Sequence, residues 1–177
     1  MRQITVSLIV FSLLAVGGCA SPVAEGQMRV SGPFLASDAP LFDDGVDFIA
    51  DPSRLDGSWL GDFRRNLDAR IDRADAIAVV RVDAIGRGRD LAGGETQVLS
   101  VTTEQVLKGK LPEQATFSSE SSSPGFGTLT RAQSRLLHQR FTVFVRWYER
   151  EDEVVALHFH LSPATEAVIG TVGARTR

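Results

Sequence analysis

The residues with the clearest chemical potential are two histidines, His158 and His160, which stand two positions apart. The segment around them has the pattern of a strand, so both side chains are expected on the same face of a sheet. Two imidazoles on one face are a typical start of a zinc or copper site, and His138 could approach them from the preceding segment. No cysteine or carboxylate stands beside the pair at ligand spacing. The sequence therefore predicts no metal site and ordinary exposed strand positions for both histidines.

A nucleophile and its base are equally hard to find. The chain contains no Gly-x-Ser-x-Gly turn, which is the usual setting of a hydrolytic serine. The serine-rich segment 118–123, with Glu120 inside it, has the composition of a solvated connector. We therefore predict no catalytic residue and no cofactor-binding residue.

Two further groups of charged residues are candidate ion sites. Asp43, Asp44, Asp47 and Asp51 offer carboxylate oxygens for calcium, but they lack the regular spacing of a calcium-binding loop. Arg87 and Arg89 flank glycines and could contact an anion, although a charged loop explains them as well. Neither group is assigned a site.

The first 18 residues have the layout of a signal peptide. Arg2 provides a basic start, residues 4–16 form an apolar run, and Gly17-Gly18 lead into Cys19. The run is too short for a membrane-spanning helix, which needs about 20 apolar residues. An exported protein is therefore predicted, with cleavage before residue 19.

The cysteine that follows the small residues resembles the lipobox of bacterial lipoproteins. That resemblance implies that the thiol of Cys19 receives a diacylglyceryl group and that its new amine is acylated with a fatty acid such as palmitate. Cys19 is the only cysteine, so it has no disulfide partner within the chain. Ala20 rather than Asp follows it, which in the lipoproteins it resembles favours the outer membrane. An ordinary signal peptide beside a cysteine is the alternative.

The composition narrows the classes of partner. The 177 residues carry 19 Lys and Arg against 22 Asp and Glu, a net charge of −3. An acidic balance gives no electrostatic attraction for nucleic acid. Apolar residues make up 43% of the chain, enough for a folded core. A membrane contact through the lipid and an envelope protein or glycan are the partners that remain.

The chain divides into three parts on its patterning. Residues 1–18 are the signal peptide, 19–53 are a lipidated cysteine and a tether rich in Gly, Pro, Ser and Asp, and 54–177 are the domain. Apolar residues interrupt the tether, so part of it is able to pack onto the domain.

Periodicity predicts one amphipathic helix followed mostly by strands. The helix covers residues 58–72, with Trp59, Phe63, Leu67 and Ile71 on its buried face. Strands are predicted at 76–82, 96–107, 115–118, 141–148 and 154–161, with loops at 86–94 and 118–127. Residues 129–139 suggest a helical turn, 149–152 a charged turn, and 164–172 a strand or a short helix.

Three segments, 74–82, 101–109 and 141–145, together resemble small bacterial exported domains related to the netrin-like and tissue-metalloproteinase-inhibitor modules. The resemblance implies a mainly β (α+β) fold, a small antiparallel OB-like β-barrel with the amphipathic helix packed alongside. The eukaryotic inhibitors of that family chelate the protease zinc through a free N-terminal cysteine and carry disulfides. Neither feature fits this sequence.

The sequence therefore favours a non-enzymatic, lipid-anchored envelope module that binds a protein or glycan through the loops at 86–94 and 118–128. A protease-inhibitor-like module, with one of these loops entering a protease cleft, is one alternative. A metal-dependent enzyme is the other, and it requires a polar pocket with perturbed groups.

Overall fold

The computed structural model describes residues 32–90, 93–149 and 155–176. The signal peptide, Cys19 and the first part of the tether lie outside the described residues, as does most of the turn at 149–152. No helix among the described residues is long and apolar enough to cross a membrane.

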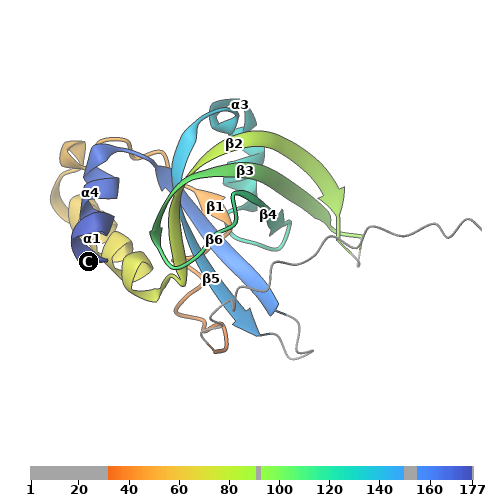
Figure 1. Ribbon diagram of the computed structural model, residues 1–177, viewed down its shortest axis with the longest axis horizontal. Helices are drawn as coiled ribbons and strands as arrows, with labels where there is room; N and C mark the ends of the chain where they lie inside the picture. The colour runs from red at the N-terminus through yellow and green to blue at the C-terminus, as the bar shows by residue number, and fades with distance from the viewer. Residues whose placement is uncertain (1–31, 91–92, 150–154, 177) are drawn as a thin grey trace, which may run out of the picture.

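A six-stranded sheet in the order β1-β6-β5-β2-β3-β4 forms the body of the protein. It curls into a half-barrel whose two ends approach each other (Figure 1). The strands are β1 (Gly45–Val46), β2 (Ala76–Arg89), β3 (Glu95–Lys108), β4 (Gln114–Glu120), β5 (Arg140–Glu149) and β6 (Val155–Pro163). All neighbouring pairs are antiparallel except β1 and β6, which are parallel.

The inner face of the curled sheet is filled by apolar side chains from both ends of the strand order. The rings of Phe117 on β4 and Phe159 on β6 lie 5.2 Å apart between centroids, and both are buried. Leu129 of α2 (Phe126–Arg131) and Leu136 of α3 (Gln133–Leu136) close this core. Burial of these shared apolar surfaces holds the sheet in its curled form.

Helices cover the other face of the sheet near the start of β2. The helix α1 (Gly57–Arg73) and the helix α4 (Glu166–Arg175) lie together there (Figure 1). They enclose Ile77 of β2 and Phe144 of β5 in a second core. Both faces of β2 are therefore covered at its beginning, which explains why the predicted strand at 76–82 is nearly continuous in apolar residues.

The predicted helix at 58–72 is confirmed, with one residue misplaced. Phe63, Leu67 and Ile71 are buried as expected, but Trp59 is 71% exposed. The first turn of α1 extends beyond the second core, so the apolar stripe continues where nothing covers it. At the other end of the chain, residues 164–172 resolve to the helix α4, which is capped by the Thr165 side chain.

The boundary expected at residue 54 is too late. Leu41 and Phe42 are buried in the second core, and Val46 belongs to the first. The strand β1 pairs with β6 through Gly45 and Val46. A short 3-10 helix, η1 (Pro52–Arg54), follows before α1. The second half of the expected tether is therefore part of the folded domain.

The prediction of a mainly β, barrel-like α+β fold with a helix packed alongside is confirmed. The sheet differs in detail from the five-stranded antiparallel barrel that the resemblance implied. It has six strands, and it is mixed because β1 adds a parallel strand from the N-terminal segment.

Candidate functional site

The parallel pairing of β1 with β6 determines which polar side chains meet. It places Asp43, Asp44 and Asp47 beside His158 and His160, although the contacting residues are 113 to 117 positions apart in the chain. Nothing in the local sequence pattern relates these aspartates to the histidines. The structure joins them in two clusters along β6.

The first cluster is centred on His160. Its Nδ1 lies 2.7 Å from Asp43 Oδ1, and its Nε2 lies 3.1 Å from Asp47 Oδ2. Ser162 also donates its hydroxyl to Asp47, at 2.7 Å. His160 is 3% exposed, so the expected exposed strand position is wrong. Both ring nitrogens are therefore occupied by carboxylates.

The carboxylates of this cluster remain charged despite their burial. Burial raises the pKa of Asp43 and of Asp47, but hydrogen bonds from His160 and its charge outweigh it, so both pKa values lie below the ordinary one. Arg70 approaches from α1, with its Nη1 3.7 Å from Asp47 Oδ2. Its Nε donates to the Leu41 carbonyl at 2.9 Å. The cluster therefore fixes the N-terminal segment between α1 and β6.

Arg70 is buried on α1 although it is charged. Burial lowers the pKa of its guanidinium, while the charges of Asp47 and Asp43 oppose that shift. A buried cation is tolerated here because carboxylates and a carbonyl surround it.

The second cluster is centred on Asp44. One carboxylate oxygen accepts from the Ser123 hydroxyl at 2.8 Å and from His158 Nδ1 at 2.7 Å. The other accepts from the Phe159 backbone N–H at 3.0 Å. The Asp44 side chain is only 4% exposed, and its backbone φ is +54°. Left-handed backbone is uncommon outside glycine, although Asp and Asn adopt it more readily than other residues.

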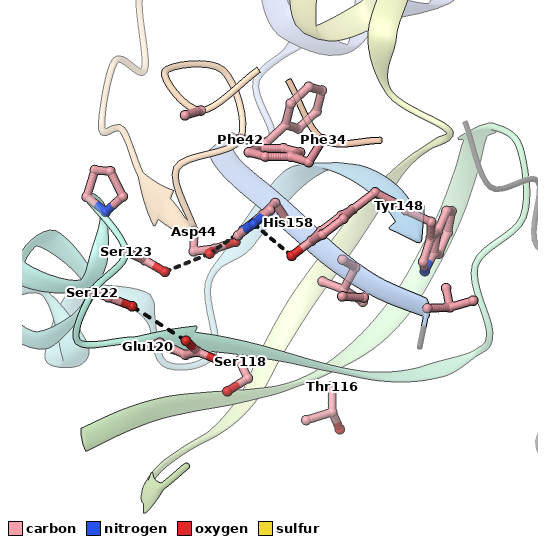
Figure 2. Close-up of a pocket in the computed structure, with 16 residues that line it drawn as sticks. Phe34, Phe42, Asp44, Thr116, Ser118, Glu120, Ser122, Ser123, Tyr148 and His158 are labelled. Atoms are coloured by element: carbon pink, nitrogen blue, oxygen red, sulfur yellow. Dashed lines mark hydrogen bonds and ion pairs between the residues drawn. The ribbon is translucent and has the colours of Figure 1, made fainter. Parts of the chain in front are cut away.

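The carboxylate of Asp44 sets the tautomer of His158. In the neutral imidazole, Nδ1 carries the proton that Asp44 accepts, and Nε2 is then an acceptor. The Tyr148 hydroxyl lies 3.1 Å from that Nε2, and the two rings stack with an interplanar angle of 2°. Phe34 covers the imidazole, with ring centroids 4.3 Å apart. The result is a hydrogen-bonded chain, Ser123–Asp44–His158–Tyr148, which Figure 2 shows running from the loop after β4 to β6 and β5 at the side of a groove.

This groove lies at the open side of the half-barrel and has a volume of about 650 Å³. One wall is largely aromatic and apolar and comes from the N-terminal segment, β5 and β6. The opposite wall is polar and comes from β4 and the loop after it (Figure 2). The lining includes Phe34, Trp147, Tyr148, Leu157 and His158 on the first wall, and Thr116, Ser118, Glu120, Ser122 and Ser123 on the second.

The chemistry available in the groove follows from these bonds. In the Asp44–His158–Tyr148 chain, Asp44 orients the imidazole, which in turn lies against the phenol hydroxyl of Tyr148. A proton could pass between that hydroxyl and the imidazole. The described residues hold no group of three or more His, Cys, Asp or Glu arranged to take a metal ion. In the two clusters, the carboxylates and imidazoles are instead hydrogen-bonded to one another.

The remaining sequence candidates lie elsewhere, except for the serine-rich segment. Four of its residues line the groove: Ser118, Glu120, Ser122 and Ser123. His138 is exposed at a turn with φ of +62°, where its N–H bonds the Val82 carbonyl. Arg87 and Arg89 line a separate cavity of about 340 Å³. Asp51 caps η1 by accepting from the Ser53 N–H.

The two loops expected to bind a partner are shorter than predicted. The strand β2 continues through Arg89 and β3 begins at Glu95, which leaves only residues 90–94 between them, and β4 and α2 occupy six of the residues 118–128. The connection between β4 and α2 is held down, because the Gly125 N–H donates to the Asp43 carbonyl at 2.7 Å. A Cβ on Gly125 would lie 2.3 Å from the Gly45 Cα, so only glycine permits this approach.

Sequence reasoning missed Tyr148 and Phe34 as parts of the site. The local pattern marks Tyr148 only as the end of an alternating strand, and Phe34 only as an apolar residue within the tether.

Comparison with known proteins adds no relative: no family model, curated protein or solved structure matches this chain.

Proposed function

We propose that this protein is a lipid-anchored, non-enzymatic binding module of the bacterial envelope that holds its partner in the groove between β4 and β6. The observation that carries the proposal is the groove itself. It combines an aromatic wall with a polar wall, and few precisely placed polar groups among apolar surface are typical of binding sites.

The hydrogen-bonded chain behind the groove supports binding more than turnover. Asp44 accepts from three donors, and His158 is held on both ring nitrogens. Side chains fixed in this way present a surface that need not rearrange when a partner arrives. Such preorganisation raises affinity because less conformational entropy is lost on binding.

The anchoring part of the proposal rests on Cys19 and the residues before it. A diacylglyceryl group with an added acyl chain would hold the protein on a membrane, since each buried methylene contributes about 0.8 kcal/mol. With Ala20 after the cysteine, we place the protein at the outer membrane, facing the periplasm. Replacing Cys19 with Ser is expected to abolish incorporation of labelled palmitate. A variant that still takes up the label and sediments with membranes would contradict the anchor.

The binding part is tested by crosslinking in the native envelope. A photoreactive benzoylphenylalanine placed at Thr116, in the groove, is expected to form a discrete adduct with the partner. The control position is Gln105, which is exposed on β3 and does not line the groove. Adducts at both positions, or at neither, would contradict a binding site in the groove.

A further inference from the structure

We propose that the partner of the groove is an extended, positively charged peptide segment that adds as a strand to the free edges of β4 and β6. This inference rests on the proposed function, because it names the chemistry of the partner that the groove holds. Strand addition gives affinity through backbone hydrogen bonds and selectivity through alternate side chains.

The first free edge belongs to β4, the last strand in the sheet order. The Ser121 N–H, just after β4, donates to the Glu95 carbonyl of β3. Backbone groups of successive residues in a strand point to opposite sides, so the even-numbered residues turn theirs outward. Thr116 and Ser118 therefore present their N–H and C=O groups at the outer edge, and both residues line the groove.

The second free edge belongs to the first half of β6. The N–H and the C=O of Phe159 point toward the N-terminal segment. The N–H donates to the Asp44 carboxylate, and the C=O accepts from the Asp44 N–H. Leu157, two residues earlier, turns its backbone groups to the same side. The strand β1 pairs with β6 only at His160 and Leu161, so among the described residues no strand covers the edge at Leu157. Leu157 lines the same groove as Thr116 and Ser118.

These two edges explain why a peptide fits better than a saccharide. An extended peptide carries donors and acceptors in the alternation that a strand edge offers, whereas the hydroxyl groups of a sugar do not repeat with that spacing. Exposed backbone edges are also costly to leave open, since they invite pairing with other chains. A partner strand would complete the half-barrel.

The charges in the groove select a basic peptide. Among its described lining residues are the carboxylates Asp44 and Glu120, and none is Lys or Arg. Asp44 is already committed to three donors, but Glu120 is exposed and has only a Ser122 hydroxyl 3.5 Å away. The aromatic rings opposite provide faces on which a Lys or Arg side chain can lie. An acidic ligand would meet uncompensated repulsion.

A proline at residue 118 tests the edge directly. Because the Ser118 N–H points outward, Ser118→Pro removes a free donor and leaves the β3–β4 ladder intact, as proline is tolerated on edge strands. The matched control, Ser118→Ala, removes the hydroxyl but keeps the N–H. A circular dichroism melt of each variant checks that the domain still folds.

The experiment selects a random phage-displayed decapeptide library against the full-length chain purified in detergent, and the enriched peptides are then synthesised. We expect enriched peptides rich in Lys or Arg whose binding falls at least about tenfold more with Ser118→Pro than with Ser118→Ala. Methylating alternate peptide amides is expected to give the same loss without touching the protein. Glu120→Gln is expected to weaken binding about threefold to tenfold, whereas Glu113→Gln, exposed outside the groove, leaves it unchanged.

Several outcomes would overturn the inference. They are a selection that enriches no peptide, enriched peptides that are acidic, and binding that is indifferent to amide methylation. Binding of a neutral oligosaccharide, with chitotetraose as the probe, in place of peptides would also overturn it. If the Thr116 crosslink forms while one of these results is found, the peptide assignment fails and the binding function stands. If no groove-specific crosslink forms, the proposed function itself fails.

Discussion

Replacing Asp44 tests whether the hydrogen-bonded chain behind the groove is a rigid support. The carboxylate accepts three hydrogen bonds, from Ser123, His158 and the Phe159 N–H, in a nearly buried position. Asp44→Ala removes the acceptor of all three donors, and each buried donor left without a partner costs about 1–3 kcal/mol.

The backbone adds a second cost that can be separated from the first. Asp44 has a φ of +54°, and left-handed backbone costs a residue such as Ala about 1–2 kcal/mol. Asp44→Gly loses the same hydrogen bonds without that strain, and Asp44→Asn keeps one acceptor oxygen and tolerates the backbone. We expect destabilisation of about 4–5 kcal/mol for Ala, about 3 kcal/mol for Gly and about 1–2 kcal/mol for Asn.

Equilibrium urea unfolding measures these differences, with the fluorescence of the buried Trp147 as the reporter. The Nδ1 proton of His158, observed by NMR, shows directly whether Asp44 sets the tautomer. An Ala variant that costs less than about 1 kcal/mol would refute the reasoning, because three buried donors cannot lose their acceptor so cheaply. Equal costs for Ala and Gly would refute the part that concerns the backbone.

Three further predictions concern acid, close packing and the histidines. Burial raises the pKa of Asp47, but hydrogen bonds from His160 and Ser162 and the charge of His160 outweigh it, so the pKa lies below the ordinary 3.8. The stability that the ionised Asp47 contributes is therefore complete above about pH 4 and is lost as the pH falls further. Urea unfolding between about pH 5 and about pH 2.5 is expected to show a smaller acid loss for Asp47→Asn than for the wild type, and equal losses would contradict this. Gly125→Ala is expected to destabilise the protein by about 1–3 kcal/mol, because the new Cβ clashes with the backbone of Gly45. Gly170→Ala, in α4 with nothing within 4 Å of the new Cβ, is expected to stabilise it by about 0.5–1 kcal/mol. Thermal melts that rank the two variants the other way would show that the close approach at Gly125 is not rigid. Replacing His158 and His160 together by Ala is expected to cost several kcal/mol, more than two exposed positions would, because each imidazole contacts buried carboxylates; metal analysis of the wild type is expected to find no stoichiometric metal, and finding one would contradict the assignment.

Much of the fold could be predicted because its signals are local. The stripe at Phe63, Leu67 and Ile71 indicates α1, and alternation or continuous apolar runs indicate the four long strands. The strand β1 could not be found in this way. It is two residues long, Gly45 and Val46, and its stability comes from pairing with β6, not from its own pattern.

The site was beyond local reasoning for the same physical reason. Asp44 and His158 each have the local pattern of an exposed polar residue, and only their pairing across the fold buries Asp44 and partly buries His158. Burial of Arg70 likewise depends on carboxylates that arrive from another segment. Periodicity reports which face of an element is apolar, but it does not report which distant polar side chains will neutralise one another.

The contact between β1 and β6 also fixes when the site can form. Its partners are 113 to 117 positions apart, so closing this loop costs more chain entropy than forming the local hairpins. The hairpin of β2 and β3 pairs residues close in sequence and can form early. The N-terminal strand must wait for β6, the last strand to be synthesised among the described residues, and until then the β6 edge of the groove and its aromatic wall remain incomplete. A chain interrupted before residue 155 would therefore contain most of the sheet and the polar wall of the groove, but it would lack the part of the aromatic wall that β6 provides.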